Sequence, residues 1–515
     1  MSQQLSEQEV VRRENLQKML DLGINPYPST TFPVTHVATE IHAGYTEGSE
    51  DYQEVCMAGR LMSRRIMGKA SFAELQDTSG RMQIYVSRDD ICPGEDKAMY
   101  NTVFKKLLDL GDFIGIKGKA FTTKTGTKSI HISELTILSK SLKPLPIVKT
   151  DADGNVYDEM TDPEFKYRQR YVDLTVNPEV REVFRQRSRM INAMRDYMTE
   201  KGYLEVETPI LQTIYGGAAA RPFKTHHNTL DIDMYMRIAN ELYLKRLIVG
   251  GFDGVFEFAK DFRNEGMSRF HNPEFTMMEL YVAYKDYNWM MDFTEEMLEA
   301  VALKVHGTTE LEVGEHTISF KRPWKRYTMF GAIEHFTGVD ITDMDEAQLR
   351  DTAKSLGIHI DKTMGKAKII DEIFGEKCEP LLIQPTFITD YPKEMSPLAK
   401  SHADTPHIVE RFEAICNAKE ILNAFSELND PIDQRERFEA QLELGKRGDE
   451  EAMQLDEDYL RAMEYGMPPT AGIGIGIDRL AMIMTNQKSI QDVLLFPQMK
   501  PEKGTPTEAE AEEKS

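Results

Sequence analysis

A pair of glutamates in the C-terminal half of the chain could supply the two carboxylates of a magnesium site. Glu413 and Glu420 lie seven residues apart in the segment HIVERFEAICNAKEILNAFSELNDP, residues 407–431. Magnesium at phosphate-binding sites takes one or two carboxylates and completes its octahedron with water and phosphate oxygens. Two glutamates taken alone fit a surface charge pair better, so this pair predicts a metal only if a phosphate site lies beside it.

The segment FEFAKDFRNEGMSRFHNPEFTMMELYVAY, residues 256–284, could supply that phosphate site. It is typical of two apolar strands joined by a charged loop, with Arg263 at the end of the first strand. A guanidinium binds phosphate or carboxylate through paired hydrogen bonds. Period-two alternation places Phe275, Glu279 and Tyr281 on one face of the second strand. A buried carboxylate there needs a partner, either a substrate cation or Arg263 itself.

A strand of alternating glycines, TAGIGIGIDRLAMI at residues 470–483, predicts a flat surface for a ligand. Gly472, Gly474 and Gly476 leave one face of the strand without side chains, and Arg479 follows at the start of an expected helix. The segment is not the GxGxxG of a βαβ unit, and the chain has no Walker lysine, so dinucleotide and P-loop sites are excluded. Close packing of a helix on this strand is the alternative.

A long helix and a strand are the first elements that must position these residues. The helix is expected over residues 177–201, with Asn177 as N-cap, Pro178 at the first helical position and Gly202 as the stop. Its apolar residues recur on one face at helical spacing, so that face must pack against another element. The segment YLEVETPIL then predicts a strand that ends at Pro209.

The N-terminal part of the chain has a different pattern. A helix over residues 6–22 is stopped by Gly23, and five short strands with one intervening helix follow up to a linker at Pro144 and Pro146. Five such strands are typical of an oligonucleotide-binding (OB) β-barrel. We therefore divide the chain into an N-terminal helical appendage, 1–52, an OB barrel, 53–146, a large domain, 147–500, with a helical insertion at about 340–376, and an acidic tail, 501–515, expected to be disordered.

Composition narrows the class of protein. A chain of 515 residues with 41% apolar residues exceeds a single core, which agrees with two or three domains. No apolar run reaches 18 residues, and the charged start has no apolar signal segment, so we expect a cytoplasmic protein without membrane contact. The four cysteines are far apart and form no CxxC pair, which favours isolated thiols over zinc or disulfides: Cys56, Cys92, Cys378 and Cys416.

Only one segment of the chain has a net charge that favours contact with RNA. The net charge of -23 opposes general polyanion binding, so DNA is not an expected partner. Residues 53–149 contain 16 Lys and Arg against 10 Asp and Glu, which leaves +6 on this segment. The barrel segment is therefore the part of the chain in which to expect RNA contact, although a basic stretch can also arise by chance.

Together and in this order, these segments resemble the three signature motifs of class II aminoacyl-tRNA synthetases. The long helix with its strand resembles the dimer-forming first motif, FRNEG through HNPEF the second and GIGIGIDRL the third. The likeness covers residues 55–500. Within subclass IIb it is greatest to lysyl-tRNA synthetases of bacterial type, through RRIMGKASF, GGAAARPFKTHHN, ELYLKRLIVGGF, HNPEFTMMELYVAY, QPTFITDYPKEMSPLAK and FSELND.

The resemblance implies a fold and an activity. The fold would be α+β, with an N-terminal OB barrel that holds the anticodon and an antiparallel β-sheet flanked by helices that carries out catalysis. The activity would be ATP-dependent activation of L-lysine to lysyl-adenylate and its transfer to the 3′ end of tRNA(Lys), with Mg²⁺ as cofactor, in a cytoplasmic homodimer. The chemistry needs alignment and charge neutralisation rather than a catalytic base.

The resemblance also implies roles for individual residues. Arg263 and Arg479 would be the catalytic residues. ATP would be bound by Arg263, Glu265, His271, Asn272, Phe275 and Arg479, and magnesium by Glu413 and Glu420. Lysine would be bound by Gly216, Glu241, Glu279, Tyr281, Asn423, Phe425 and Glu427, with Glu427 and Tyr281 at its ε-ammonium. The anticodon would be bound by Arg64, Arg65, Phe72, Gln83 and Glu134.

The chain departs from the bacterial pattern at two places. Relatives usually have GGREIGNGF where this chain has NAKEILNAF, so Leu422 and Ala424 replace smaller residues. Strand alternation turns Leu422 away from Asn423, which predicts that it packs beneath the sheet. Asn240 stands where proline is common, and an asparagine is a suitable helix N-cap.

Three other functions fit parts of the sequence. Aspartyl and asparaginyl synthetases share the barrel and the motifs, but they need a cationic pocket, whereas this chain offers Glu279, Glu427 and Tyr281. A non-catalytic RNA-binding paralogue would be favoured by loss of a motif arginine, and Arg263 and Arg479 are both present. A paralogue that lysylates a protein would lack the N-terminal barrel.

Overall fold

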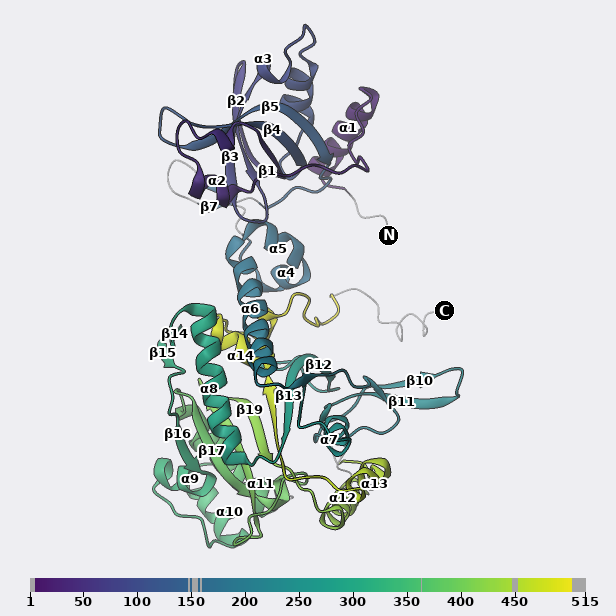
Figure 1. Cartoon of the computed structure of the whole chain (residues 1–515), viewed down its shortest axis with the longest axis vertical. Helices are drawn as coiled ribbons and strands as arrows, with labels where there is room; N and C mark the ends of the chain where they lie inside the picture. Colours follow the sequence, from purple (N-terminus) through teal and green to yellow (C-terminus); the bar gives the residue numbers. More distant parts are fainter. Residues whose placement is uncertain are drawn as a thin grey trace. The chain divides into compact units, whose positions relative to one another are not determined.

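The chain forms two compact units in a computed structural model, one over Met1–Pro178 and one over Glu179–Ser515. Their helices and strands are labelled in Figure 1. The described residues are 5–146, 149–150, 156–157, 160–362, 364–446 and 453–502. The predicted acidic tail lies outside the described residues from residue 503 onward.

The smaller unit is built around the closed five-stranded barrel that the strand pattern predicts. The strands are neighbours in the order β1-β2-β3-β5-β4, with β3 and β5 parallel and the other pairs antiparallel. Their alternating apolar side chains fill the barrel interior, among them Leu75, Ile84 and Ile116. The strands are β1 (Val55–Met67), β2 (Ala70–Gln76), β3 (Arg81–Ser87), β4 (Phe113–Thr122) and β5 (Lys128–Ser139).

Helix α1 (Glu7–Asp21) packs against this barrel. It begins at the N-cap Ser6, which forms a capping box. Arg12 donates hydrogen bonds to the carbonyl oxygens of Ser141 and Leu110, at 3.1 and 2.9 Å, and Met19 is buried in the barrel's core. The residues predicted as an appendage thus share a core with the barrel. The other elements of the unit are α2 (Ala38–Gly44), η1 (Glu50–Tyr52), α3 (Arg88–Ile91), η2 (Met99–Leu107), β6 (Lys149–Thr150), β7 (Val156–Tyr157), α4 (Pro163–Arg168) and α5 (Arg170–Val176).

The larger unit contains an eight-stranded sheet in the order β16-β17-β18-β19-β20-β13-β12-β8. Only the two edge pairs, β16 with β17 and β12 with β8, are parallel, so the antiparallel sheet that was predicted is confirmed. The strands are β8 (Leu204–Glu205), β12 (Gly254–Phe262), β13 (Glu274–Ala283), β16 (Lys325–Thr328), β17 (Thr386–Pro392), β18 (Ile408–Cys416), β19 (Lys419–Ser426) and β20 (Thr470–Gly476).

Helices α6 (Pro178–Glu200), α8 (Tyr287–His306) and α14 (Ile477–Met484) share the main core with one face of this sheet. Met194 of α6, Leu298 of α8 and Ile475 of β20 are buried there, as the apolar face of the 177–201 helix predicts. Leu422 is 1% exposed and belongs to the same core, so its predicted position beneath the sheet is confirmed. The opposite face is left for α7 (Glu241–Val249) and for a cavity.

Two segments differ in detail from the sequence pattern. In the segment YLEVETPIL, only Leu204–Glu205 form a strand before Pro209, where the predicted strand ends. Further along, the backbone N–H and hydroxyl of Thr208 donate to the carboxylate of Glu257 at 3.3 and 2.7 Å. Residues 340–376, predicted to be mostly helical, hold α10 and nearly all of α11. The remaining elements are β9 (Leu211–Gln212), β10 (Lys224–His227), β11 (Ile232–Met236), β14 (Glu310–Val313), β15 (His316–Ser319), α9 (Met329–Thr337), α10 (Glu346–Ser355), α11 (Lys366–Lys377), η3 (Glu379–Leu381), η4 (Lys393–Met395), α12 (Pro431–Lys446), α13 (Glu457–Glu464) and α15 (Ile490–Val493).

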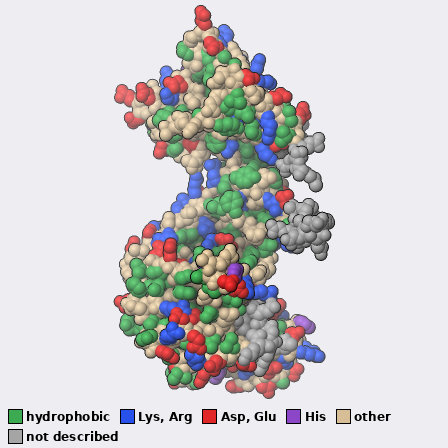
Figure 2. Space-filling view, turned by 90° about the vertical axis from the view of Figure 1, so that its right-hand side faces the viewer, with side chains coloured by type: hydrophobic (Ala, Val, Ile, Leu, Met, Phe, Trp, Pro, Cys, Tyr) green, Lys and Arg blue, Asp and Glu red, His purple; other side chains and the backbone are tan. Residues whose placement is uncertain are grey.

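The surface of the larger unit is mixed in character. Figure 2 shows acidic, basic and hydrophobic side chains interspersed over the face in view. On this face, acidic side chains therefore do not gather into one patch.

Candidate active site

Strands β13, β20 and β19 form the floor of a cavity of about 690 Å³. Gly472 of β20 pairs with Tyr281 on one side and with Phe425 on the other. A Cβ atom at Gly472 would lie 2.0 Å from Oε1 of Glu427 and 2.5 Å from the ring of Tyr281. Only glycine fits at this position. Gly472, Gly474 and Gly476 all line the cavity, so the bare face of β20 borders it.

One end of the cavity is formed by Arg263, which follows β12. Its guanidinium lies 5.0 Å from the ring centre of Phe275, and its Nε donates to the carbonyl oxygen of Ile238 at 3.4 Å. Within the part of the chain that the structure describes, Arg263 forms no ion pair with Glu279. Glu279 instead accepts a hydrogen bond from the hydroxyl of Tyr281 at 2.8 Å. Arg263 is thus available to an anion.

Arg479, in the first turn of α14, borders the same end. It donates to the backbone oxygen and to Oε2 of Glu420, at 2.8 and 3.1 Å, and it lies 3.2 Å from Nε2 of His271. Burial and the nearby Arg479 charge lower the pKa of His271, so a neutral ring accepts this hydrogen bond. Asp478 ties α14 to β13 by accepting the backbone N–H of Thr276 at 2.8 Å. These contacts fix the direction of Arg479.

The two glutamates predicted to hold magnesium lie on neighbouring strands. Glu420 lines the cavity, whereas Glu413 is not among the lining residues and contacts Arg411 at 2.5 Å. Burial raises the pKa of Glu413 to about 7, and Arg411 opposes that rise. Among the described residues, no three His, Cys, Asp or Glu side chains are grouped to hold a metal ion. Two carboxylates fit magnesium that takes its other ligands from water and phosphate.

The opposite end of the cavity, which we name the acidic end, carries three buried carboxylates. Glu241, Glu279 and Glu427 are 6%, 5% and 1% exposed, and the buried Tyr281 lies among them. Burial and the neighbouring carboxylates raise the pKa of Glu279 well above its ordinary value. One protein cation, Lys245 of α7, contacts Glu241 and Glu427. The acidic end therefore has more negative than positive side chains and suits a cationic ligand.

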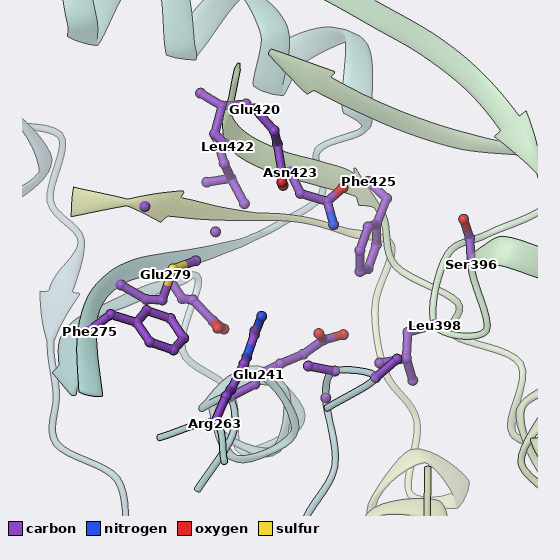
Figure 3. A pocket seen from close by; sticks show the side chains of 18 of the residues that line it. Glu241, Arg263, Phe275, Glu279, Ser396, Leu398, Glu420, Leu422, Asn423 and Phe425 are labelled. Atoms are coloured by element: carbon purple, nitrogen blue, oxygen red, sulfur yellow. The ribbon is translucent and has the colours of Figure 1, made fainter. Parts of the chain in front are cut away.

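Most of the predicted ligand-binding residues meet in this one cavity. Figure 3 shows Arg263, Glu241 and Glu279 directed into it, with Asn423 and Phe425 facing them from β19. Two predicted residues do not line it, Gly216 and Glu413, although their neighbours Gly217 and Arg411 do. Those that line it are Glu241, Arg263, Glu265, His271, Asn272, Phe275, Glu279, Tyr281, Glu420, Asn423, Phe425, Glu427 and Arg479.

Sequence reasoning missed Arg411 and Lys245. Arg411 donates to Asn423 Oδ1 at 3.0 Å and to Ser396 Oγ at 2.8 Å. It therefore holds the amide of Asn423, a residue predicted to bind the lysine substrate. Its alternation with Glu413 along β18 was the available signal. For Lys245, the signal was its place one helical turn after Glu241, which is common on solvated helix faces as well.

A second cavity, of about 640 Å³, lies on the barrel. Three of the residues predicted to contact the anticodon line it: Phe72, Gln83 and Arg65. Arg64 does not line it; its guanidinium lies 5.7 Å from the ring centre of Phe104 on the other side of β1. Glu134 does not line it either and pairs with Lys117 at 2.7 Å. Two further aromatic residues line the cavity, Tyr85 and Phe121.

Comparisons with known proteins agree with this architecture. Residues 162–500 match the family described as tRNA synthetases class II (D, K and N), and residues 55–138 match the OB-fold nucleic acid binding domain. The chain belongs to the class II tRNA synthetases. A protein named Lysine–tRNA ligase from Porphyromonas gingivalis is 62% identical over 98% of this chain and 87% of its own length.

Other relatives of this class II tRNA synthetase have the same name. The Lysine–tRNA ligase of Christiangramia forsetii is 63% identical over 97% of this chain and 87% of its own length. That of Azobacteroides pseudotrichonymphae is 60% identical over 97% of this chain and 99% of its own length. No helix among the described residues has the length and apolar character needed to cross a membrane.

Proposed function

We propose that this chain uses ATP to activate lysine and then joins the lysine to transfer RNA, as a lysine–tRNA ligase. Relatives with that name are 60–63% identical to it over nearly its whole length. One structural observation carries the proposal: a single cavity joins Arg263 and Phe275 at one end to the acidic end at the other. An anionic nucleotide and a cationic amino acid can therefore lie side by side.

ATP binds at the end formed by Arg263 and Arg479. Arg263 grips the α-phosphate and the carboxylate of the amino acid, and the adenine lies between Phe275 and Arg479. Because Arg479 is held by Glu420 and His271, little side-chain freedom is lost when the nucleotide binds. Glu265, His271 and Asn272 border the same end and hold the nucleotide.

Lysine binds with its side chain toward the acidic end. Glu427 and Tyr281 receive the ε-ammonium, while Glu241, Asn423 and the backbone near Gly216 orient the α-amino and carboxylate groups. Glu279 and Phe425 line the pocket around the aliphatic chain. A substrate without the terminal ammonium leaves buried carboxylates unpaired, which is the source of specificity.

Magnesium is the cofactor expected for this reaction. Glu420 and Glu413 would hold it, with Glu420 on the cavity side. Bound there, the ion supplies positive charge that neutralises the phosphates of ATP.

The residues present suit a reaction without a catalytic base. The lysine carboxylate attacks the α-phosphorus in line, pyrophosphate leaves, and the 3′-hydroxyl of the terminal adenosine then attacks the lysyl-adenylate. Arg263 neutralises charge that develops on the α-phosphate, and the cavity holds the two reactants in contact. Both the neutralisation of charge and the contact between reactants depend on prior alignment, which the partly buried hydrogen bonds of Arg411 and Arg479 maintain.

The barrel cavity binds the anticodon of tRNA(Lys). Phe72 and Tyr85 offer partly exposed rings for unstacked bases, their ring centres 5.2 Å apart, and Gln83 can read a base edge. Arg65 lines the cavity and can contact phosphate, whereas Arg64 and Glu134 act from outside it. We further propose a cytoplasmic homodimer with α6 at its interface, and domain boundaries at residues 146 and 500.

The aspartyl and asparaginyl alternatives need a net positive pocket. Lys245 is a buried cation behind the cavity wall, where Glu241 and Glu427 already contact it, and Glu279 adds a third carboxylate to the lining. The balance is negative and disfavours an aspartate side chain. A non-catalytic paralogue is disfavoured because Arg263, Glu420 and Arg479 line one cavity.

The direct test is amino-acid-dependent exchange of pyrophosphate into ATP with each of the twenty amino acids, followed by esterification of tRNA(Lys). We expect lysine to give the fastest exchange and the only stable ester. Exchange driven best by aspartate or asparagine would overturn the specificity, and no exchange with any amino acid would support the non-catalytic alternative.

A further inference from the structure

Lys245 is a buried cation that the mechanism above does not use. Its side chain is 0% exposed, and Nζ lies 2.5 Å from Oε1 of Glu241 and in ion-pair contact with Oε2 of Glu427. The ring centre of Phe425 lies 5.4 Å from the same Nζ. Although burial opposes the charged form, Glu241 and Glu427 raise the pKa of Lys245 above its ordinary value, so it is a cation.

The two oxygens of Glu427 have different surroundings. Both oxygens are buried and neither has a hydrogen-bond partner within the described residues, but Oε2 is the one in ion-pair contact with Lys245. Oε1 is the atom that a Cβ at Gly472 would meet at 2.0 Å, beside the ring of Tyr281, and both Gly472 and Tyr281 line the cavity. One oxygen is therefore occupied by the protein, and the other is presented to the ligand. A buried oxygen without a partner is costly, so a donor must come from the ligand.

The charges at the acidic end also divide into one part that the protein balances and one part that is left for the ligand. The acidic end has three carboxylates, Glu241, Glu279 and Glu427, and one cation, Lys245. Substrate lysine brings two ammonium groups, and its carboxylate is matched by Arg263. Lys245 and the two ammonium groups of lysine together offer one cation for each of the three carboxyl groups, so Glu279, whose pKa is raised by burial, can ionise when lysine binds. Without Lys245, one buried carboxylate would lack a cation even with lysine bound, and such a group tends to take up a proton.

We propose that Lys245 is a positioning residue for the amino-acid substrate: it holds Oε2 of Glu427, balances one of the three carboxylates, and leaves Oε1 and two negative charges for a diammonium ligand. This proposal rests on the proposed function, because the ligand it describes is lysine. Lys245 acts through Glu427 and Glu241, so its loss should affect lysine and leave ATP binding little changed.

Lys245→Met tests the proposal, since methionine has a similar length and no charge. In lysine-dependent pyrophosphate exchange we expect the KM for lysine to rise at least tenfold, with the KM for ATP within twofold of wild type. The acid limb of the kcat/KM profile for lysine should move to higher pH, because a nearby cation keeps carboxylates ionised. The titratable groups that face Lys245 and Glu427 are Glu241 on α7, Tyr281 on β13 and Tyr459 on α13. Burial raises the pKa of both tyrosines, so the groups that titrate on the acid limb are the carboxyls of Glu241 and Glu427.

Lys140 provides a matched control in the barrel unit. Its side chain is also 0% exposed and contacts two carboxylates, Asp109 at 2.5 Å and Asp112 at 2.9 Å. Lys140→Met should lower the unfolding temperature, as the loss of any such buried ion pair does, without changing the KM for lysine or the acid limb. Lys245→Arg keeps the charge and should return the acid limb toward wild type. If Lys245→Met does not fold, Lys245→Gln replaces it in the comparison.

The outcomes separate the two proposals. If the wild-type enzyme gives no lysine-dependent exchange, the proposed function fails. If wild type is active and the uncharged variant keeps the wild-type KM for lysine and the wild-type acid limb, the positioning role fails alone. Equal increases in both KM values with an unmoved acid limb would mean that Lys245 only supports the fold, which also overturns the positioning role.

Discussion

The two cavities of this protein have similar volumes, about 690 Å³ on the large sheet and about 640 Å³ on the barrel. They differ in how far the charged side chains near them are exposed to water. At the acidic end, Glu427 and Lys245 are 1% and 0% exposed. In the barrel, the Glu74 and Arg81 side chains are both 42% exposed and lie 3.9 Å apart. Water screens the second pair and not the first.

The difference bears on the kind of recognition that each cavity can perform. A buried carboxylate discriminates strongly between ligands that do and do not satisfy its charge. Partly exposed rings such as Phe72 and Tyr85 add moderate affinity through stacking and accept any base. We therefore expect substitutions in the sheet cavity to have large effects on one substrate, and substitutions in the barrel to have smaller effects on tRNA alone.

The largest effect is expected from Glu427→Gln, which removes one buried charge and keeps the shape. The loss of the substrate ion pair costs about 3–5 kcal/mol, or a several-hundredfold rise in the KM for lysine. The KM for ATP should stay near wild type in pyrophosphate exchange. Glu410→Gln, the same change on neighbouring β18 at a partly buried side chain outside the cavity, serves as the control. Equal losses for lysine and ATP would contradict the role of Glu427.

Arg263→Ala should have the next largest effect, this time on rate. Removing a donor that neutralises charge in the transition state lowers kcat by about 10²–10³-fold. Steady-state exchange at saturating lysine and ATP measures this. The matched variant is Arg322→Ala, whose side chain is 50% exposed. If Arg263→Ala changed only the KM for ATP, Arg263 would serve in binding alone.

Asp261→Asn tests whether burial of charge beneath the cavity costs stability. Burial raises the pKa of Asp261 to about 6, above the ordinary 3.8, although Arg237 opposes the rise. The ionised form therefore costs the folded state about 3 kcal/mol above pH 6, and nothing below about pH 4. The variant should unfold at a higher temperature at pH 7.5, and the gain should shrink as the pH falls from 6 to 4.

Thermal unfolding of wild type and Asp261→Asn at pH 4.5, 6 and 7.5 measures that gain. Asp196→Asn, at a side chain that is 54% exposed, should give no pH-dependent difference. A gain of the same size at all three pH values would mean that the asparagine packs better, and that the buried charge is not the cause.

The smallest effect is expected in the barrel. Phe72→Ala removes a stacking surface worth about 1–3 kcal/mol per base, so the KM for tRNA should rise roughly tenfold to a hundredfold. Pyrophosphate exchange, which needs no tRNA, should be unchanged. Phe113→Ala in the same barrel is the control, because Phe113 is exposed but lies outside the cavity. A loss of exchange activity in Phe72→Ala would contradict the proposal that the barrel cavity acts on tRNA alone.

Short-range patterns in the sequence were sufficient for much of this protein. The capping box at Ser6, the apolar face of α6 and the bare face of β20 all follow from residues two to four positions apart, so local geometry determines them. The alternation of Leu422 with Asn423 predicted the burial of Leu422 correctly. The motif arginines, Glu279 and Glu427 were also recognisable, because they occur in three segments of fixed order, whereas Glu241 followed only from the family resemblance.

Only the tertiary structure decided which charges meet. Arg64 and Arg65 are adjacent in β1 and face opposite sides, so just one of them can line the barrel cavity. Arg411 forms an ion pair with Glu413. Lys245 of α7 forms an ion pair with Glu427, which follows β19 much further along the chain. Such pairs depend on sheet order and helix packing, for which no local spacing is a signal. The energy of a buried charge depends on these partners, and so does the selectivity of the cavity.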